Sequence, residues 1–194
     1  MVVFYCPEFS RLWEYWLSIC GDAMIPDREN FNPANLTSLL SDIGILDWDG
    51  EKYYLRLLGT SAIDELGIDF SGPKSTQMSA APVRDFVMSN FKTIFNFSCG
   101  LQAVVVERGR AGLVVEAAIL FLPMATGEGK LNQALTCRRH LTTLGYDGKY
   151  PDLIQLGINR MNFIDLGSGV PDIDLEAEVK KTLYIAPGWE SSSL

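Results

Sequence analysis

The sequence predicts an α+β fold, in which a five-stranded antiparallel sheet is covered by helices and preceded by an N-terminal amphipathic helix. Apolar residues recur at helical spacing in residues 8–20 and again in 82–98. Five shorter apolar runs are bounded by Gly and Asp turns, as strands usually are. With 194 residues, 47% of them hydrophobic, the chain has enough apolar material for one domain with a buried core and a tail.

The first amphipathic helix is predicted over residues 8–20. Polar residues fill one side, and the apolar stripe on the other contains Phe9, Leu12, Trp13, Trp16, Leu17 and Cys20. Gly21 can end this helix because glycine adopts left-handed backbone angles without steric cost. A second, shorter helix is predicted after Asn32, a good N-cap residue, and Pro33, which suits a first helical turn.

A β-hairpin is predicted around Asp49-Gly50. These two turn residues separate an apolar run over 43–48 from another over 53–58. A short helix should follow, capped by Thr60 or Ser61 and ended by Gly67.

The longer helix at 82–98 should cover the sheet, and three strands should follow it in a meander. The strands are predicted at 101–107, 113–122 and 131–143, with glycine-containing turns between them. The expected organisation is N-terminal helices in 1–42, a core in 43–145, and a partly mobile C-terminal extension in 146–194 with a helix near 172–181.

Charge and hydropathy argue against nucleic acid and membranes as partners. The formal net charge is −8, so the overall field repels phosphate backbones and anionic lipid headgroups. No apolar run reaches the roughly 18 to 20 residues that a membrane-spanning helix needs, and the N-terminus lacks the basic segment of a secretory signal. A cytoplasmic location is therefore expected.

The chain has little material for catalysis, metal binding or cofactor chemistry. His140 is the only histidine, and the four cysteines are widely spread without a C-x-x-C pair, so no zinc site or disulfide framework is expected. Glycine-rich nucleotide motifs are absent as well. We therefore predict neither enzymatic activity nor a bound metal or cofactor.

The order of helices and strands is that of a PAS fold, and several motifs resemble a bacterial PAS-like domain family first described as an uncharacterised domain of alphaproteobacteria. The resemblance covers roughly residues 9–124, extended by the meander to about 145. Its motifs are Leu12-Trp-Glu-Tyr-Trp16, Ile25-Pro-Asp-Arg28 with Phe31-Asn-Pro33, Tyr54-Leu-Arg-Leu-Leu-Gly-Thr60, Gly67-Ile-Asp-Phe-Ser-Gly72 and Phe121-Leu-Pro-Met124. The resemblance implies a PAS-like fold and a sensory or signalling role, without implying a ligand. Asp22 stands where many members carry a basic residue.

Three interpretations of the function stay open at this point. The first is a signalling domain that responds to a small, mostly apolar molecule between helix and sheet, or to a signalling protein partner. The second is an interaction or scaffolding protein with a solid core. The third is an enzyme of the NTF2-like type, a fold that also opens with helices and curls an antiparallel sheet into a cone.

The candidate ligand-binding residues are Arg56, Phe86, Asn90, Phe91 and His140. Asn90 places one polar group among the aromatic residues of the 82–98 helix, which is a common composition for a small-molecule pocket. Arg56 interrupts an apolar strand, so it either pairs with an aspartate, faces solvent, or anchors a ligand. The candidate aspartates are Asp27, Asp47 and Asp64. His140 falls on the last strand of the meander, and we expect it to be an ordinary strand residue that binds no ligand.

An interface is predicted on the first helix. Phe9, Trp13 and Trp16 form an aromatic stripe, and exposed aromatic patches of this kind are typical of protein–protein interfaces. A homodimer is therefore expected. The competing expectation is that the same helix packs back on its own domain.

Overall fold

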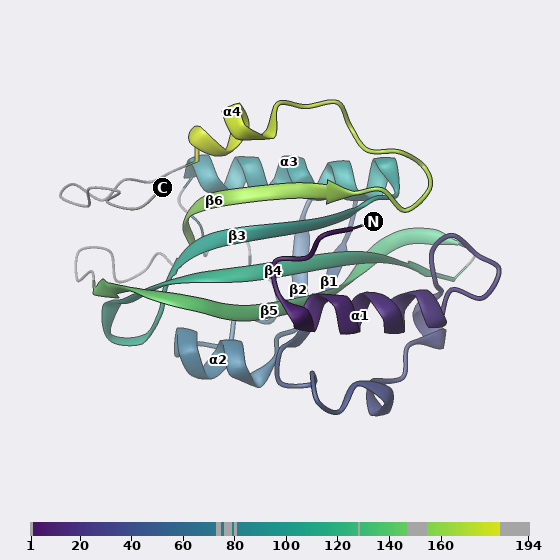
Figure 1. Ribbon diagram of the computed structural model, residues 1–194, viewed down its shortest axis with the longest axis horizontal. Coiled ribbons are helices and arrows are strands. Elements are labelled where there is room, and N and C mark those ends of the chain that lie inside the picture. The colour runs from purple at the N-terminus through teal and green to yellow at the C-terminus, as the bar shows by residue number, and fades with distance from the viewer. Residues whose placement is uncertain are drawn as a thin grey trace.

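The protein is built around one six-stranded antiparallel sheet with helices on both faces (Figure 1). The computed structural model describes residues 2–72, 75, 79, 81–127, 129–146 and 155–182, without the side chains of 81, 82 and 110. The elements are α1 (Pro7–Ser18), β1 (Ile43–Trp48), β2 (Tyr53–Leu57), α2 (Thr60–Leu66), α3 (Ala81–Phe97), β3 (Gly100–Arg108), β4 (Leu113–Thr126), β5 (Lys130–Tyr146), β6 (Gln155–Ile164) and α4 (Leu175–Lys180). The strand order is β2-β1-β5-β4-β3-β6.

The helices begin and end close to the predicted residues, except that one predicted helix is a 3-10 turn and another is shorter than predicted. Helix α1 starts with Pro7 in its first turn and ends at Ser18. The second predicted helix is a single 3-10 turn, Pro33–Leu36, in which the side chain of Asn32 accepts the Ala34 N–H. Helix α4 is shorter than the 172–181 segment predicted for it.

The predicted hairpin is confirmed by β1 and β2. In the turn, Asp49 Oδ1 accepts hydrogen bonds from the Glu51 N–H at 2.8 Å and from the Lys52 N–H at 2.7 Å. Gly50 has a φ of 106°, which a residue with a side chain rarely adopts. The turn chemistry therefore fixes the register of the two strands.

Helix α2 is capped differently from the prediction. Its N-cap position is Gly59 and makes no side-chain cap hydrogen bond, so neither Thr60 nor Ser61 caps it. A Cβ on Gly59 would lie 2.3 Å from the carbonyl oxygen of Ser41. Close backbone approach therefore selects glycine here. At the other end Gly67 has a φ of 80°, as predicted for the residue that ends the helix.

The sheet has one strand more than the five predicted. Strand β6 pairs with β3 from Gly100↔Ile164 to Glu107↔Gln155, and it lies in the segment expected to be an extension of the domain. A register shift between Val104 and Val105 interrupts the pairing. Because of this shift, residues three positions apart on β6 point into the same core. The two-residue spacing of apolar residues that usually indicates a strand is therefore not visible in the sequence.

Alternate residues of the strands point into two separate cores, which we name the α1 face and the α3 face. On the α1 face, Phe9, Leu12 and Trp16 of α1 pack against strand residues such as Val104 and Ala118. On the α3 face, residues of α3 pack against the neighbouring strand positions, Ala103 and Ala117. Figure 1 shows α1 and α3 on opposite sides of the sheet, with α4 beside β6.

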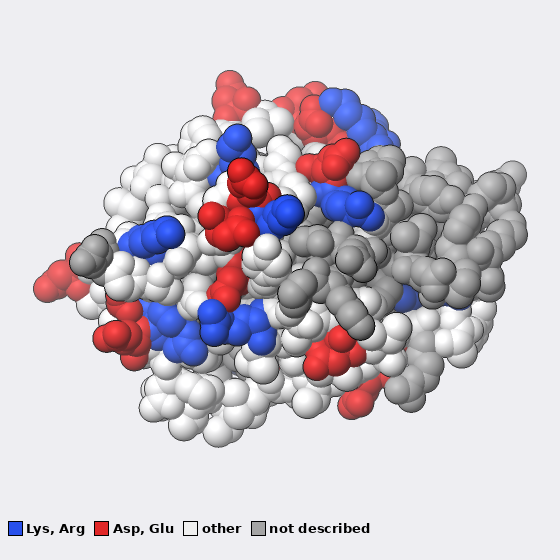
Figure 2. All heavy atoms as spheres, turned by 180° about the vertical axis from the view of Figure 1, so that it is seen from behind, with Lys and Arg blue, Asp and Glu red and all other residues white. Residues whose placement is uncertain are grey.

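Surface charge and helix length bear on possible partners. Figure 2 shows acidic and basic side chains mixed across the face seen from behind. In the described part of the chain, every helix is too short or too polar to cross a bilayer. The mobile C-terminal end predicted after the last helix falls from residue 183 onward, outside the described residues.

Candidate functional site

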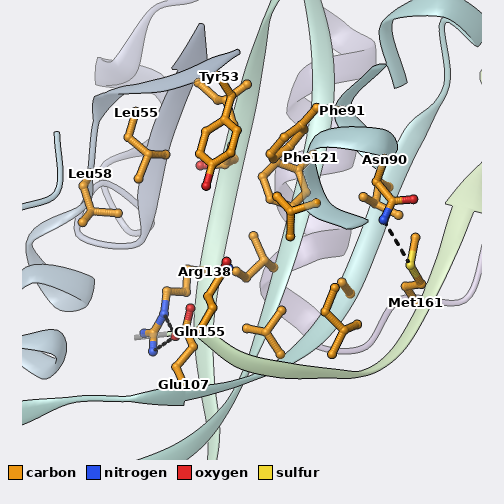
Figure 3. Close-up of a pocket in the computed structure, with 18 of the residues that line it drawn as sticks. Tyr53, Leu55, Leu58, Asn90, Phe91, Glu107, Phe121, Arg138, Gln155 and Met161 are labelled. Atoms are coloured by element: carbon orange, nitrogen blue, oxygen red, sulfur yellow. Dashed lines mark hydrogen bonds and ion pairs between the residues drawn. The ribbon is translucent and has the colours of Figure 1, made fainter. Parts of the chain in front are cut away.

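A cavity of about 90 Å³ lies between α3 and the sheet, on the α3 face (Figure 3). A single water needs roughly 10 to 15 Å³ of such space, so this cavity has room for a small molecule. Its lining comes from both hairpin strands, the meander, β6, α2, α3 and the segment after β2. The residues are Leu46, Tyr53, Leu55, Leu58, Leu66, Val87, Asn90, Phe91, Leu101, Ala103, Val105, Glu107, Ile119, Phe121, Thr136, Arg138, Gln155, Ile158 and Met161.

Aromatic rings form one wall of this cavity. The ring of Phe91 lies 4.8 Å from that of Tyr53 and 5.1 Å from that of Phe121, the latter edge to face. The Tyr53 hydroxyl donates to the carbonyl oxygen of Ser75 at 3.1 Å. Burial raises the pKa of Tyr53 to about 12, so the phenol stays neutral and acts as part of the apolar wall.

Asn90 supplies a polar group inside the apolar part of the cavity. It is 7% exposed, and its Nδ2 donates to Met161 Sδ at 3.8 Å (Figure 3). A thioether sulfur is a weak acceptor. Among the described residues this is the partner of the Asn90 side chain, so most of its hydrogen-bonding capacity is left for a molecule in the cavity.

A buried ion-pair network forms a second polar region of the cavity. Arg138 Nε and Nη2 lie 2.8 and 2.7 Å from Glu107 Oε2, and Nη1 lies 2.6 Å from Glu65 Oε2. The side chains of Arg138 and Glu107 are 8% and 3% exposed. Figure 3 shows Arg138, Glu107 and Gln155 together, apart from Asn90 and Met161.

The network keeps its groups charged in spite of burial. Burial alone would disfavour the guanidinium, but Glu107 and Glu65 raise the pKa of Arg138 above its ordinary value. Burial would likewise disfavour ionised Glu65, but Arg138 and then His140 hold the pKa of Glu65 below its ordinary value. Two carboxylates and one guanidinium therefore share the space beside the cavity.

The structure brings together only part of the predicted ligand-binding set. Asn90 and Phe91 line the cavity. Phe86 is half-buried and packs against the core of the α3 face outside the lining. Arg56 is 60% exposed, so it faces solvent, and it pairs with Asp47, one of the three candidate aspartates, at 2.7 Å. His140 is 42% exposed and bonds Glu65, also outside the lining.

Sequence reasoning missed Glu107 and Arg138, although the pattern of β3 contained a signal for Glu107. Glu107 follows Leu101, Ala103 and Val105 at steps of two along β3, so the same face of the strand carries all four. A charge on an otherwise apolar strand face is unusual unless it has a partner. Gln155 was missed because β6 was not predicted. Its Oε1 accepts from Ser79 Oγ.

The aromatic stripe of α1 is not an open surface. Phe9 and Trp16 are 0% and 1% exposed, and Trp16 Nε1 donates to the carbonyl oxygen of Pro123 at 2.9 Å. Trp13 is half-buried and stacks on Trp16 with ring centroids 5.5 Å apart. The prediction of an interface at Phe9 and Trp16 is corrected here: burying both rings against the sheet completes the core, so the helix packs back on its own domain.

Comparison with known proteins identifies the family of this chain through its sequence profile. Two solved structures are similar in fold: a light-oxygen-voltage domain studied with a flavin analogue (TM-score 0.46, 10% identity, covering 61% of this chain and 86% of that one), and a fungal LOV domain photoreceptor (TM-score 0.42, 9% identity, covering 59% and 94%). No curated protein matches this sequence. The sequence profile of the PAS domain family matches residues 6–138. The chain belongs to the PAS domain family.

Proposed function

We propose that this PAS domain is a sensor whose signal is a small, mostly apolar molecule bound in the cavity of the α3 face. The observation that carries the proposal is the cavity itself, about 90 Å³ of space between α3 and the sheet. Asn90 gives such a molecule a hydrogen-bonding partner, and Phe91 and Phe121 give it apolar contact. No catalytic role is part of the proposal.

The remaining parts of the proposal rest on the sequence. A signalling protein that recognises the bound state would be the partner, and a homodimer remains a prediction whose surface excludes Phe9 and Trp16 because both are buried. Membership of the bacterial PAS-like group and a cytoplasmic location are proposed on the motifs and composition described above.

The test is to fill the cavity from α3. In the Asn90→Trp variant the indole enters the existing space, so we expect near-wild-type thermal stability and loss of any bound molecule. Native mass spectrometry measures the mass of any molecule bound to the purified wild-type protein and whether that mass is absent from the variant. In a solid core the same substitution would overpack and cost about 1 to 3 kcal/mol.

Ser89→Trp is the matched control, because Ser89 is the preceding residue on the same helix and is exposed. It should keep both stability and bound mass. The proposal fails if Asn90→Trp lowers the melting temperature by many degrees while Ser89→Trp does not. That outcome would support the scaffolding interpretation.

A further inference from the structure

We propose that the molecule bound in the cavity carries an amine, and that its ammonium group is recognised by Glu107. This inference rests on the proposed function, since it names the chemical class of the ligand at the same site. Three features carry it: the position of Glu107 at the cavity wall, the charge balance of the network around it, and the accessibility of the opposite charge.

The side chain of Glu107 lines the cavity, and only one of its two carboxylate oxygens contacts Arg138. Both contacts from Arg138 go to Oε2. Among the described residues Arg138 is the partner of this carboxylate, so Oε1 has its hydrogen-bonding capacity available. The side chain lines the cavity while only 3% of it is exposed. A donor from a bound ammonium would therefore meet a buried carboxylate oxygen, and hydrogen bonds from a charged group are the stronger class.

The buried network also has an excess of negative charge. Arg138 is shared between Glu107 and Glu65, so one buried guanidinium faces two carboxylates. The fourth group, His140, contacts Glu65 rather than Glu107 and is 42% exposed. A buried net charge is costly. A cationic ligand at Glu107 would bring this part of the site to neutrality.

An anionic ligand fits the same site poorly. Arg138 is already paired with both Glu107 and Glu65, although its buried Nη2 atom makes no hydrogen bond of good geometry. Arg84, another cation of this region, does not line the cavity. An anion would add a further negative charge beside the two carboxylates.

The apolar walls define the rest of the molecule. Phe91, Phe121, Ile119 and Ile158 face the same space as Glu107. The ligand class is therefore a small primary amine on an apolar body, with the body against the rings and the ammonium at the carboxylate.

Three probes with one body and different charges test the inference on the intact chain: benzylamine, toluene and benzoate. Titration is followed by the NMR signals of the Asn90 side-chain amide. We expect benzylamine to bind about tenfold or more tightly than toluene, the size of one charge-assisted hydrogen bond, and benzoate to bind more weakly than toluene. Glu107→Gln should remove the advantage of benzylamine and leave toluene unchanged, whereas Asp85→Asn, an exposed change on α3, should alter neither.

Each outcome separates the inference from the proposed function. If toluene and benzylamine bind equally, the amine inference is overturned and the cavity remains a binding site. If benzoate binds most tightly, the inference is overturned in favour of recognition by Arg138. If none of the three probes binds, both proposals fail. Even if Glu107→Gln does not fold, the affinities of the three probes for the wild-type chain show whether the cavity prefers an amine.

Discussion

The two faces of the sheet are built from the same strands but are packed in different ways. On the α1 face the largest side chains are fully enclosed, and Leu12, Leu120 and Leu135 have no exposed surface. Polar groups that enter this core are bonded to the backbone: the Trp16 N–H donates to the carbonyl of Pro123, and the buried Gln102 amide donates to the Val3 carbonyl and accepts from the Tyr5 N–H. On the α3 face a comparable apolar core surrounds a cavity and includes an ion-pair network and a nearly unbonded asparagine.

The difference shows how one sheet can combine stability with a binding site. A closed apolar core supplies stabilising burial without leaving polar groups to satisfy. The opposite face can then contain space and buried charge, both of which cost stability. The α1 face therefore stabilises the sheet, and the α3 face is the one on which we propose that a ligand binds.

Two arginines give the largest expected contrast in stability. Arg138→Met leaves the carboxylates of Glu107 and Glu65 buried without their cation, which should cost about 3 to 5 kcal/mol. Arg56→Met breaks an exposed pair with Asp47 and should cost at most about 1 kcal/mol. Urea denaturation of the two variants measures both values. Equal costs would show that the network beside the cavity is not a buried one.

Acid should weaken the network through Glu65. Its pKa is lowered in the folded protein relative to the ordinary value of about 4.3. Its contribution to stability is therefore fully present above that value and is lost as the pH falls through the lower, folded pKa. Between pH 6 and pH 3 the wild type should lose more stability than Glu65→Gln.

Glu51→Gln is the control for this effect, because it removes an exposed carboxyl from the hairpin turn. Between pH 6 and pH 3, the free energy of unfolding of Glu51→Gln should fall by the same amount as that of the wild type. Parallel curves for all three proteins would contradict a role of the Glu65 carboxylate in holding α2 to β5.

Much of the fold could be predicted because its signals are local. The helical spacing of Phe9 and Trp16, the Asp49-Gly50 turn, and the glycine after α2 each act within a few residues. The order of these elements along the chain indicated a PAS fold, and the motifs of the PAS-like family pointed to the same fold. Strand β6 escaped prediction because a bulge in its pairing with β3 shifts the apolar period, and pairing between distant segments is not visible in a single sequence.

The candidate site was predicted less completely because it depends on contacts between distant segments. Asn90 and Phe91 were found from their place on one helix. Glu107 and Arg138 are 31 residues apart and meet only because β3 and β5 share one face of the sheet. The aromatic stripe of α1 was predicted to be an interface with another protein, but Phe9 and Trp16 pack against the sheet of their own chain.

A pair of matched substitutions tests the difference between the two faces most directly. Ala103 lines the cavity from β3, and Ala118, on the adjacent strand β4, points into the α1 face and has no exposed surface. Replacing each alanine by leucine adds the same atoms at both positions, so the two changes in the free energy of unfolding compare a site beside a cavity with a site in a packed core. We predict that Ala118→Leu costs about 1 to 3 kcal/mol through overpacking, whereas Ala103→Leu costs less than about 1 kcal/mol because the side chain enters existing space. Equal costs in urea denaturation would contradict the account, because they would mean that the α3 face is packed as tightly as the α1 face.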